Sequence, residues 1–177
     1  MSKRIHPAPS LRARALATEM ERANDALITT VEQIPDAQWQ AITVAEGWPI
    51  AVTAHHVAMS YPSLLRTVAT VAASGSVVAT SATLDEANAH HAATFRDVSK
   101  AETLAALRHN GTELVSFLGG LTDAQLEATG HVPLLGDAPV SVEQVIERLV
   151  LRHCEVHLVS IRKTISNFSR GQEQRTS

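Results

Sequence analysis

Residues 141–161, SVEQVIERLVLRHCEVHLVSI, carry a helical pattern that places two histidines on an apolar face. Ser141 and Gln144 form a capping box, which is typical of the first turn of a helix. Apolar residues then recur at three- and four-residue spacing, the repeat of one helical face. They are Val142, Val145, Ile146, Leu149, Val150 and Val156. At about 100° per residue, His153 falls near the centre of this face and His157 beside it, so both are predicted to turn toward the core.

The same spacing predicts four earlier helices, separated by segments rich in glycine, proline and small residues. The expected bounds are Ser10–Ile34, Pro49–Ser74, Leu84–Val98 and Ser99–Leu118, and the final helix is expected to end near Phe168. No pair of strands is expected, so the predicted fold class is an all-α bundle. One domain is expected over residues 10–168, with an N-terminal extension at 1–9 and a disordered tail at 169–177.

Charge and composition exclude several classes of function. The net charge is −3 with neutral histidines, and the lysines and arginines are scattered, so no nucleic-acid partner is expected. No run of about 20 apolar residues could span a bilayer, so no membrane segment is expected. Cys154 is the only cysteine, which rules out an intramolecular disulfide and favours a reducing compartment. We therefore expect a soluble, cytoplasmic protein in which Cys154 has a packing role.

Six of the nine histidines fall in close pairs, at positions 55 and 56, 90 and 91, and 153 and 157. Side chains four residues apart on a helix lie roughly 5–6 Å from each other, so His153 and His157 can converge on one metal ion. The alternative is a pair of core histidines that are hydrogen-bonded to carbonyl groups. Two buried imidazoles are costly to leave unpaired, and a metal ion satisfies both, which favours the metal site.

A catalytic zinc-like site usually has three protein ligands, so a third ligand is expected from another helix. The candidates are His55, His56, His90 and His91. His55 and His56 project about 100° apart, and periodicity does not choose between them. Glu147 and Glu155 are candidates for carboxylates that orient the ligands, and nothing in the sequence selects one of them.

The segment LDEANAHHAATF, residues 84–95, carries a second group of polar residues. Helical spacing places Asn88 and His91 on the same side as Leu84 and Phe95, while His90 points away. Asn88 and His91 are therefore expected to line any cavity in the bundle. The alternative is a buried polar pair that satisfies itself or the backbone.

The segment GWPIAVTAHHV, residues 47–57, resembles the start of the second helix in the DinB/YfiT-like superfamily of metal-binding bundles. RHCEVHLVSI, residues 152–161, is similar to the superfamily's last-helix motif, in which two ligands lie four residues apart. The resemblance covers roughly residues 10–168 and implies three metal ligands, His56, His153 and His157. The sequence departs from the pattern at Ala51 and Val52, where relatives often carry a charged pair, and in the additional imidazole of His55.

This resemblance implies a four-helix bundle with up-down-down-up topology, frequently a homodimer, that holds a divalent metal ion. Zn²⁺ is the first expectation and Ni²⁺ the second. Such proteins include transferases and isomerases that use a low-molecular-weight thiol such as mycothiol, bacillithiol or glutathione. The expected function is therefore a thiol-dependent transferase or isomerase with a small-molecule substrate, in which Trp48 contributes to the cofactor site and Asn88 and His91 act on the substrate. The alternatives are a metal-dependent hydrolase and a non-catalytic ligand-binding or stress-response module.

Overall fold

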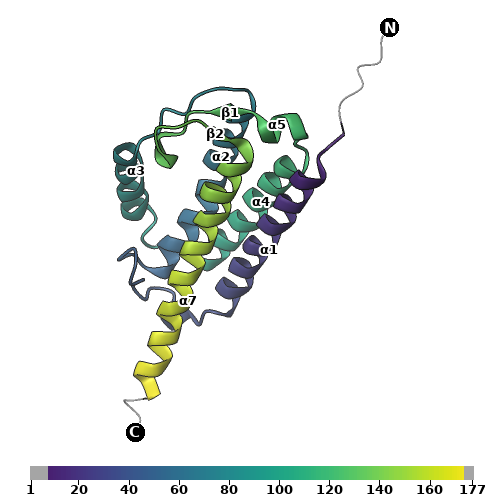
Figure 1. Ribbon diagram of the computed structural model, residues 1–177. Coiled ribbons are helices and arrows are strands. Elements are labelled where there is room, and N and C mark those ends of the chain that lie inside the picture. The colour runs from purple at the N-terminus through teal and green to yellow at the C-terminus, as the bar shows by residue number, and fades with distance from the viewer. Residues whose placement is uncertain (1–7, 174–177) are drawn as a thin grey trace.

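The computed structural model describes residues 8–173, and four long helices form its bundle (Figure 1). They are α1 (Leu11–Gln33), α2 (Ile50–Ala72), α4 (Lys100–Gly119) and α7 (Arg152–Glu173). The last of these continues directly from α6 (Val142–Val145) and η3 (Ile146–Leu151). A shorter helix, α3 (Ser81–Thr94), lies to one side of the bundle (Figure 1). None of the helices among the described residues is long and apolar enough to cross a membrane.

The bundle has the predicted up-down-down-up topology. The backbone N–H of Ser10 donates to the carbonyl of Leu121 at 2.8 Å, which ties the start of α1 to the end of α4 and makes these helices antiparallel. The indole of Trp39 donates to the carbonyl of Val98 at 3.0 Å, so α2 and α4 begin at the same end and run parallel. Helix α7 returns past the loop that precedes α2 (Figure 1). The predicted all-α fold class is confirmed.

Side-chain caps fix where most helices begin. The Ser10 hydroxyl accepts hydrogen bonds from the backbone N–H groups of Arg12 and Ala13 at the start of α1. The predicted capping box forms at Ser141 before α6, and a second forms at Ser99 before α4. A third, at Thr122, opens α5 (Asp123–Glu127). Each box satisfies backbone N–H groups that a helix start otherwise leaves unpaired.

Several element bounds differ from those predicted. Helix α3 begins three residues earlier, because a capping box at Thr80 opens it, and ends at Thr94 rather than Val98. Two strands of two residues each, β1 (Thr129–Gly130) and β2 (Val140–Ser141), form an antiparallel pair that was not predicted. Helix α7 continues to Glu173, past the predicted end at Phe168. The rest of the expected extension and tail, residues 1–7 and 174–177, lies outside the described residues.

The apolar face of the last helix is rotated from its predicted position. Cys154 is fully buried at its centre, with Leu158 and Ile161, whereas Val156 is 40% exposed. Prediction of Val156 in the core and of His153 at the centre of the face was therefore wrong. The cause is η3, a π-helical stretch whose wider turn takes one extra residue and rotates everything after it by roughly 100°. The predicted packing role of Cys154 agrees with this burial.

Candidate metal centre

Three histidines from two antiparallel helices meet at one point beside the core. His56 belongs to α2, and His153 and His157 lie one turn apart on α7. One ring nitrogen from each lies within 4.8 Å of the other two. The ring centroids are 5.1 Å apart for His56 and His153, 5.2 Å for His56 and His157, and 4.6 Å for the α7 pair. The structure thus brings together the three residues that the resemblance implied.

His157 is held by a carboxylate from the loop before α2. Its Nδ1 lies 2.8 Å from Glu46 Oε1, and the side chains are only 14% and 9% exposed. A carboxylate accepts hydrogen bonds, so Nδ1 is the donor, and in the neutral imidazole Nε2 keeps its lone pair. Ser160 donates to the other oxygen, Oε2, at 2.5 Å. In many metal sites a ligating histidine is oriented in this way, by donating its second ring N–H to a carboxylate.

The Glu46 carboxylate is held in its ionised form by these contacts. Burial alone would raise its pKa, but hydrogen bonds from His157, Ser160 and Thr43 lower the pKa to about 2. The loop geometry that makes this possible depends on Gly47, whose φ of +70° lies in the left-handed region that glycine adopts without strain. Gly47 donates to the carbonyl of Thr43 at 2.9 Å, which closes the turn around Glu46.

His153 is oriented by a hydroxyl one turn beyond His56. Ser60 Oγ lies 3.0 Å from His153 Nε2 and donates its proton to the carbonyl of Val57 at 2.7 Å. Because residues four apart share a helical face, Ser60 stands on the same side of α2 as His56. The Ser60 contact therefore fixes the ring of His153 against α2.

The environment keeps the imidazoles of His153 and His56 neutral near pH 7. Burial, together with the neighbouring His157 and His56, lowers the pKa of His153 to about 3. Burial and the surrounding histidines lower the pKa of His56 to about 4. An unprotonated ring offers a lone pair, which metal binding requires.

The donor set fits a divalent transition metal ion. Tetrahedral Zn–N bonds of about 2.1 Å place two nitrogens about 3.4 Å apart, so nitrogens separated by up to 4.8 Å reach one ion after the rings rotate toward it. Imidazole suits Zn²⁺ and Ni²⁺, whereas Mg²⁺ and Ca²⁺ prefer oxygen ligands. The cluster is therefore consistent with metal binding.

A cavity of about 500 Å³ opens onto the three histidines. Trp48, predicted near the cofactor, lines it and packs edge-on against His56, with ring centroids 5.5 Å apart. Asn88 and His91, predicted to line a cavity, do so from α3, and His90 is exposed. The cavity thus brings every predicted site residue to one place.

His55 takes no part in the three-histidine cluster. It is 5% exposed and turns toward α3, where its Nδ1 lies 3.4 Å from Nε2 of His91. Phe95 packs against both rings, with centroid distances of 4.4 Å to His55 and 4.7 Å to His91. His55 therefore supports His91 from behind, and the choice that periodicity left open falls geometrically on His56.

The carboxylate that orients a ligand was missed by the sequence reasoning. Glu147 is exposed, and Glu155 is paired with Arg152 at 3.0 Å on the outer side of α7. Glu46 lies in a loop, where no periodic pattern indicates which way a side chain points. The only sign of its role in the sequence is its position next to Gly47 and Trp48. Ser60 could have been found, since it follows His56 by one turn.

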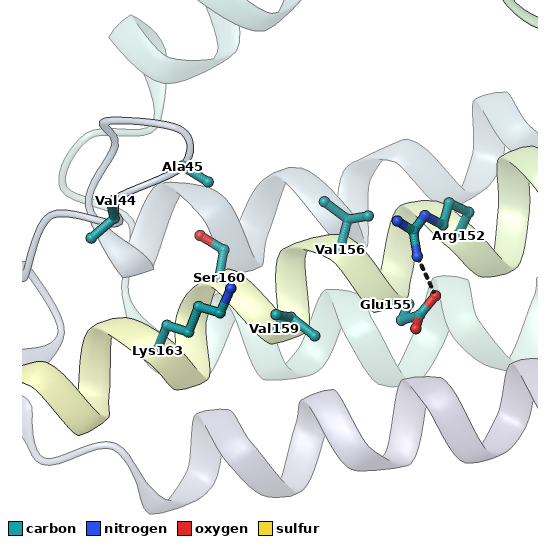
Figure 2. A pocket seen from close by; sticks show the side chains of 8 residues that line it. All are labelled: Val44, Ala45, Arg152, Glu155, Val156, Val159, Ser160 and Lys163. Carbon is teal, nitrogen blue, oxygen red and sulfur yellow. Dashed lines mark hydrogen bonds and ion pairs between the residues drawn. The ribbon is translucent and has the colours of Figure 1, made fainter.

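A second hollow, of about 310 Å³, lies along another face of α7 (Figure 2). Val44 and Ala45 face Val156 and Val159 across it. None of the cluster histidines lines this hollow, and the Arg152–Glu155 pair stands at its edge (Figure 2). The chemistry of the site therefore belongs to the larger cavity, which all three histidines line.

Comparisons with known proteins agree with the fold and with the motifs. The profile of the DinB superfamily matches residues 19–161. YfiT from Bacillus subtilis, described as a probable metal-dependent hydrolase with an unusual four-helix bundle topology, superposes with a TM-score of 0.74 at 17% identity, covering 96% of this chain and 94% of that one. A mycothiol-dependent maleylpyruvate isomerase superposes with a TM-score of 0.67 at 12% identity, covering 84% of this chain and 60% of that one.

At these identities the two likenesses show the fold alone, and the chain spans less than two thirds of the isomerase. No curated protein matches the chain significantly by sequence. The profile match, in contrast, extends over most of the chain and includes all three histidines of the cluster. The chain belongs to the DinB superfamily.

Proposed function

We propose that the protein is a metal-dependent transferase or isomerase that uses a low-molecular-weight thiol, with His56, His153 and His157 as metal ligands. The observation that carries this proposal is the position of the three imidazoles in the wall of a cavity of about 500 Å³. Structural zinc sites usually have four protein ligands, whereas catalytic sites have three and an open position. When bound, the ion would supply the positive charge that promotes ionisation of a thiol.

The residues around the ligands have separate roles in this proposal. Glu46 and Ser60 are positioning residues, because they hold the rings of His157 and His153. Trp48 forms the wall beside His56 and shields the reacting groups from water. These contacts involve no substrate, so their effect on turnover is exerted through the histidines.

His91 and Asn88 face the cluster from α3 and are proposed to act on the substrate. The ring centroid of His91 lies 5.5 Å from that of His56, so a molecule held at the cluster is within reach of His91. Imidazole can accept and return a proton, and the Asn88 amide can orient a carbonyl or hydroxyl group. The side chain of Asn88 makes no hydrogen bond to any other described residue, which leaves its amide available to a ligand.

Metal analysis of the purified protein tests the site. We expect about one Zn²⁺ or Ni²⁺ per chain, lost in His153→Ala and in His157→Ala. His90→Ala is the matched control, because His90 is an exposed histidine of α3 outside the cluster. Unchanged stoichiometry in both α7 variants would remove the basis of the proposal and favour the non-catalytic binding module.

The second candidate function is a metal-dependent hydrolase, because the same three-ligand site can promote ionisation of water. The two functions separate in paired assays. Thiol transfer is followed with monochlorobimane, in which the sulfur forms a bond to carbon as chloride leaves. Hydrolysis is followed with an activated ester. Turnover of the ester at full rate without thiol, and no metal-dependent transfer with thiol, would establish the hydrolase instead.

A further inference from the structure

The wall of the metal-site cavity carries no positive side chain. None of the described residues that line it is a lysine or an arginine, and its single acid is Glu46. Arg148 and Arg152, next in sequence to two lining residues, point elsewhere: Arg148 donates to the carbonyl of Leu135 and Arg152 pairs with Glu155. Away from the metal ligands, the lining side chains therefore offer a ligand carboxylate or phosphate no lysine or arginine as counter-charge.

The hydroxyl groups along α2 also present acceptors rather than donors. Ser60, Ser63 and Thr67 line the cavity in a row. Each donates its proton to a backbone carbonyl of its own helix, at 2.7, 2.8 and 3.1 Å. A hydroxyl has one proton, so the lone pairs that remain can accept from a ligand hydroxyl or amide N–H but repel an anionic oxygen.

A further part of the cavity wall is apolar, beside the polar side chains of Asn88 and His91 on α3. This apolar part is formed by Leu84 and Ala87 from α3, Leu134 from the short helix η2 (Pro133–Leu135) and Leu149 from η3. An apolar wall favours carbon and excludes charged groups, because an anion there loses its hydration without a partner.

From these walls we infer that the ligand of this cavity carries one acidic group, at the three histidines, and is otherwise uncharged, with hydroxyl or amide donors along α2 and carbon against the leucines. The inference rests on the proposed metal-dependent function, and it selects among thiols. A thiol whose carboxylates are absent or amidated fits the walls, whereas a dicarboxylate thiol such as glutathione does not.

The experiment uses Co²⁺-loaded protein and two thiols that differ in one group, N-acetylcysteine amide and N-acetylcysteine. Binding of sulfur to Co²⁺ is measured by its charge-transfer absorption, and each affinity is corrected for the thiol pKa of the probe. We expect the amide to bind at least about tenfold more tightly, because the carboxylate finds no lysine or arginine on the cavity wall. Leu84→Lys places a cation on the cavity wall and is expected to reduce this ratio, with Leu84→Met as the uncharged control.

The outcomes separate this inference from the function on which it rests. Equal affinities in the wild-type protein, or the same ratio in Leu84→Lys and Leu84→Met, would overturn the inference alone. Absence of any Co²⁺ spectrum would overturn the metal-site proposal and the inference with it. A higher affinity for N-acetylcysteine would also overturn the inference, because its carboxylate would then have a partner in the cavity or at the metal ion.

Discussion

Replacing Glu46 by glutamine tests whether the carboxylate behind His157 controls metal affinity. The substitution keeps the size and one hydrogen-bond acceptor but removes a charge that is 9% exposed and bonded to His157 at 2.8 Å and Ser160 at 2.5 Å. Loss of such a partner typically weakens metal binding about 10- to 100-fold, or roughly 1.4–2.7 kcal/mol. We expect Glu46→Gln to weaken Zn²⁺ binding within this range.

Competition with a chromophoric chelator at fixed pH measures this change, and Glu155→Gln is the matched control. Glu155 lies on the same helix as His157, but it lines the second hollow (Figure 2) and pairs with Arg152. Loss of the Glu155 charge should therefore leave the affinity for Zn²⁺ unchanged. A Glu46→Gln affinity within about twofold of the wild type would refute the role assigned to Glu46. Equal losses in both variants would attribute the effect to net charge alone.

Three further predictions concern stability and assembly. The metal-free protein should lose stability as the pH falls below about 6.5, the ordinary pKa of histidine. In this range the unfolded chain takes up protons, whereas folded His56 and His153, with pKa values of about 4 and about 3, do not. Urea denaturation at pH 7.5 and at pH 5 measures the difference in the free energy of unfolding. Gly111→Ala should destabilise the fold by about 1–3 kcal/mol in thermal denaturation, because its Cβ would overlap the buried Asn24 amide, whereas Gly119→Ala meets only Ala17 at 3.4 Å. A homodimer is expected in sedimentation velocity, and a monomer at all concentrations would contradict it.

The helices of the bundle were predictable because their signals are local. Capping residues such as Ser10 and Ser99 act within one turn, and apolar spacing repeats over many residues. The two-residue strands β1 and β2 have too few residues for any period, and only the folded chain brings them together. The position of Glu46 likewise depends on a loop that turns at Gly47, where sequence indicates a turn but no direction.

The histidines of α7 show how a correct residue assignment can follow from incorrect geometry. An uninterrupted α-helix would place His153 at the centre of the core face and Cys154 to one side. The π-helical stretch η3 reverses these positions: Cys154 fills the core, and His153 turns toward Ser60 and the cavity. A metal site on the core face would have no room for a second reactant. The extra residue in η3 therefore makes the difference between two buried histidines and two that a ligand can reach.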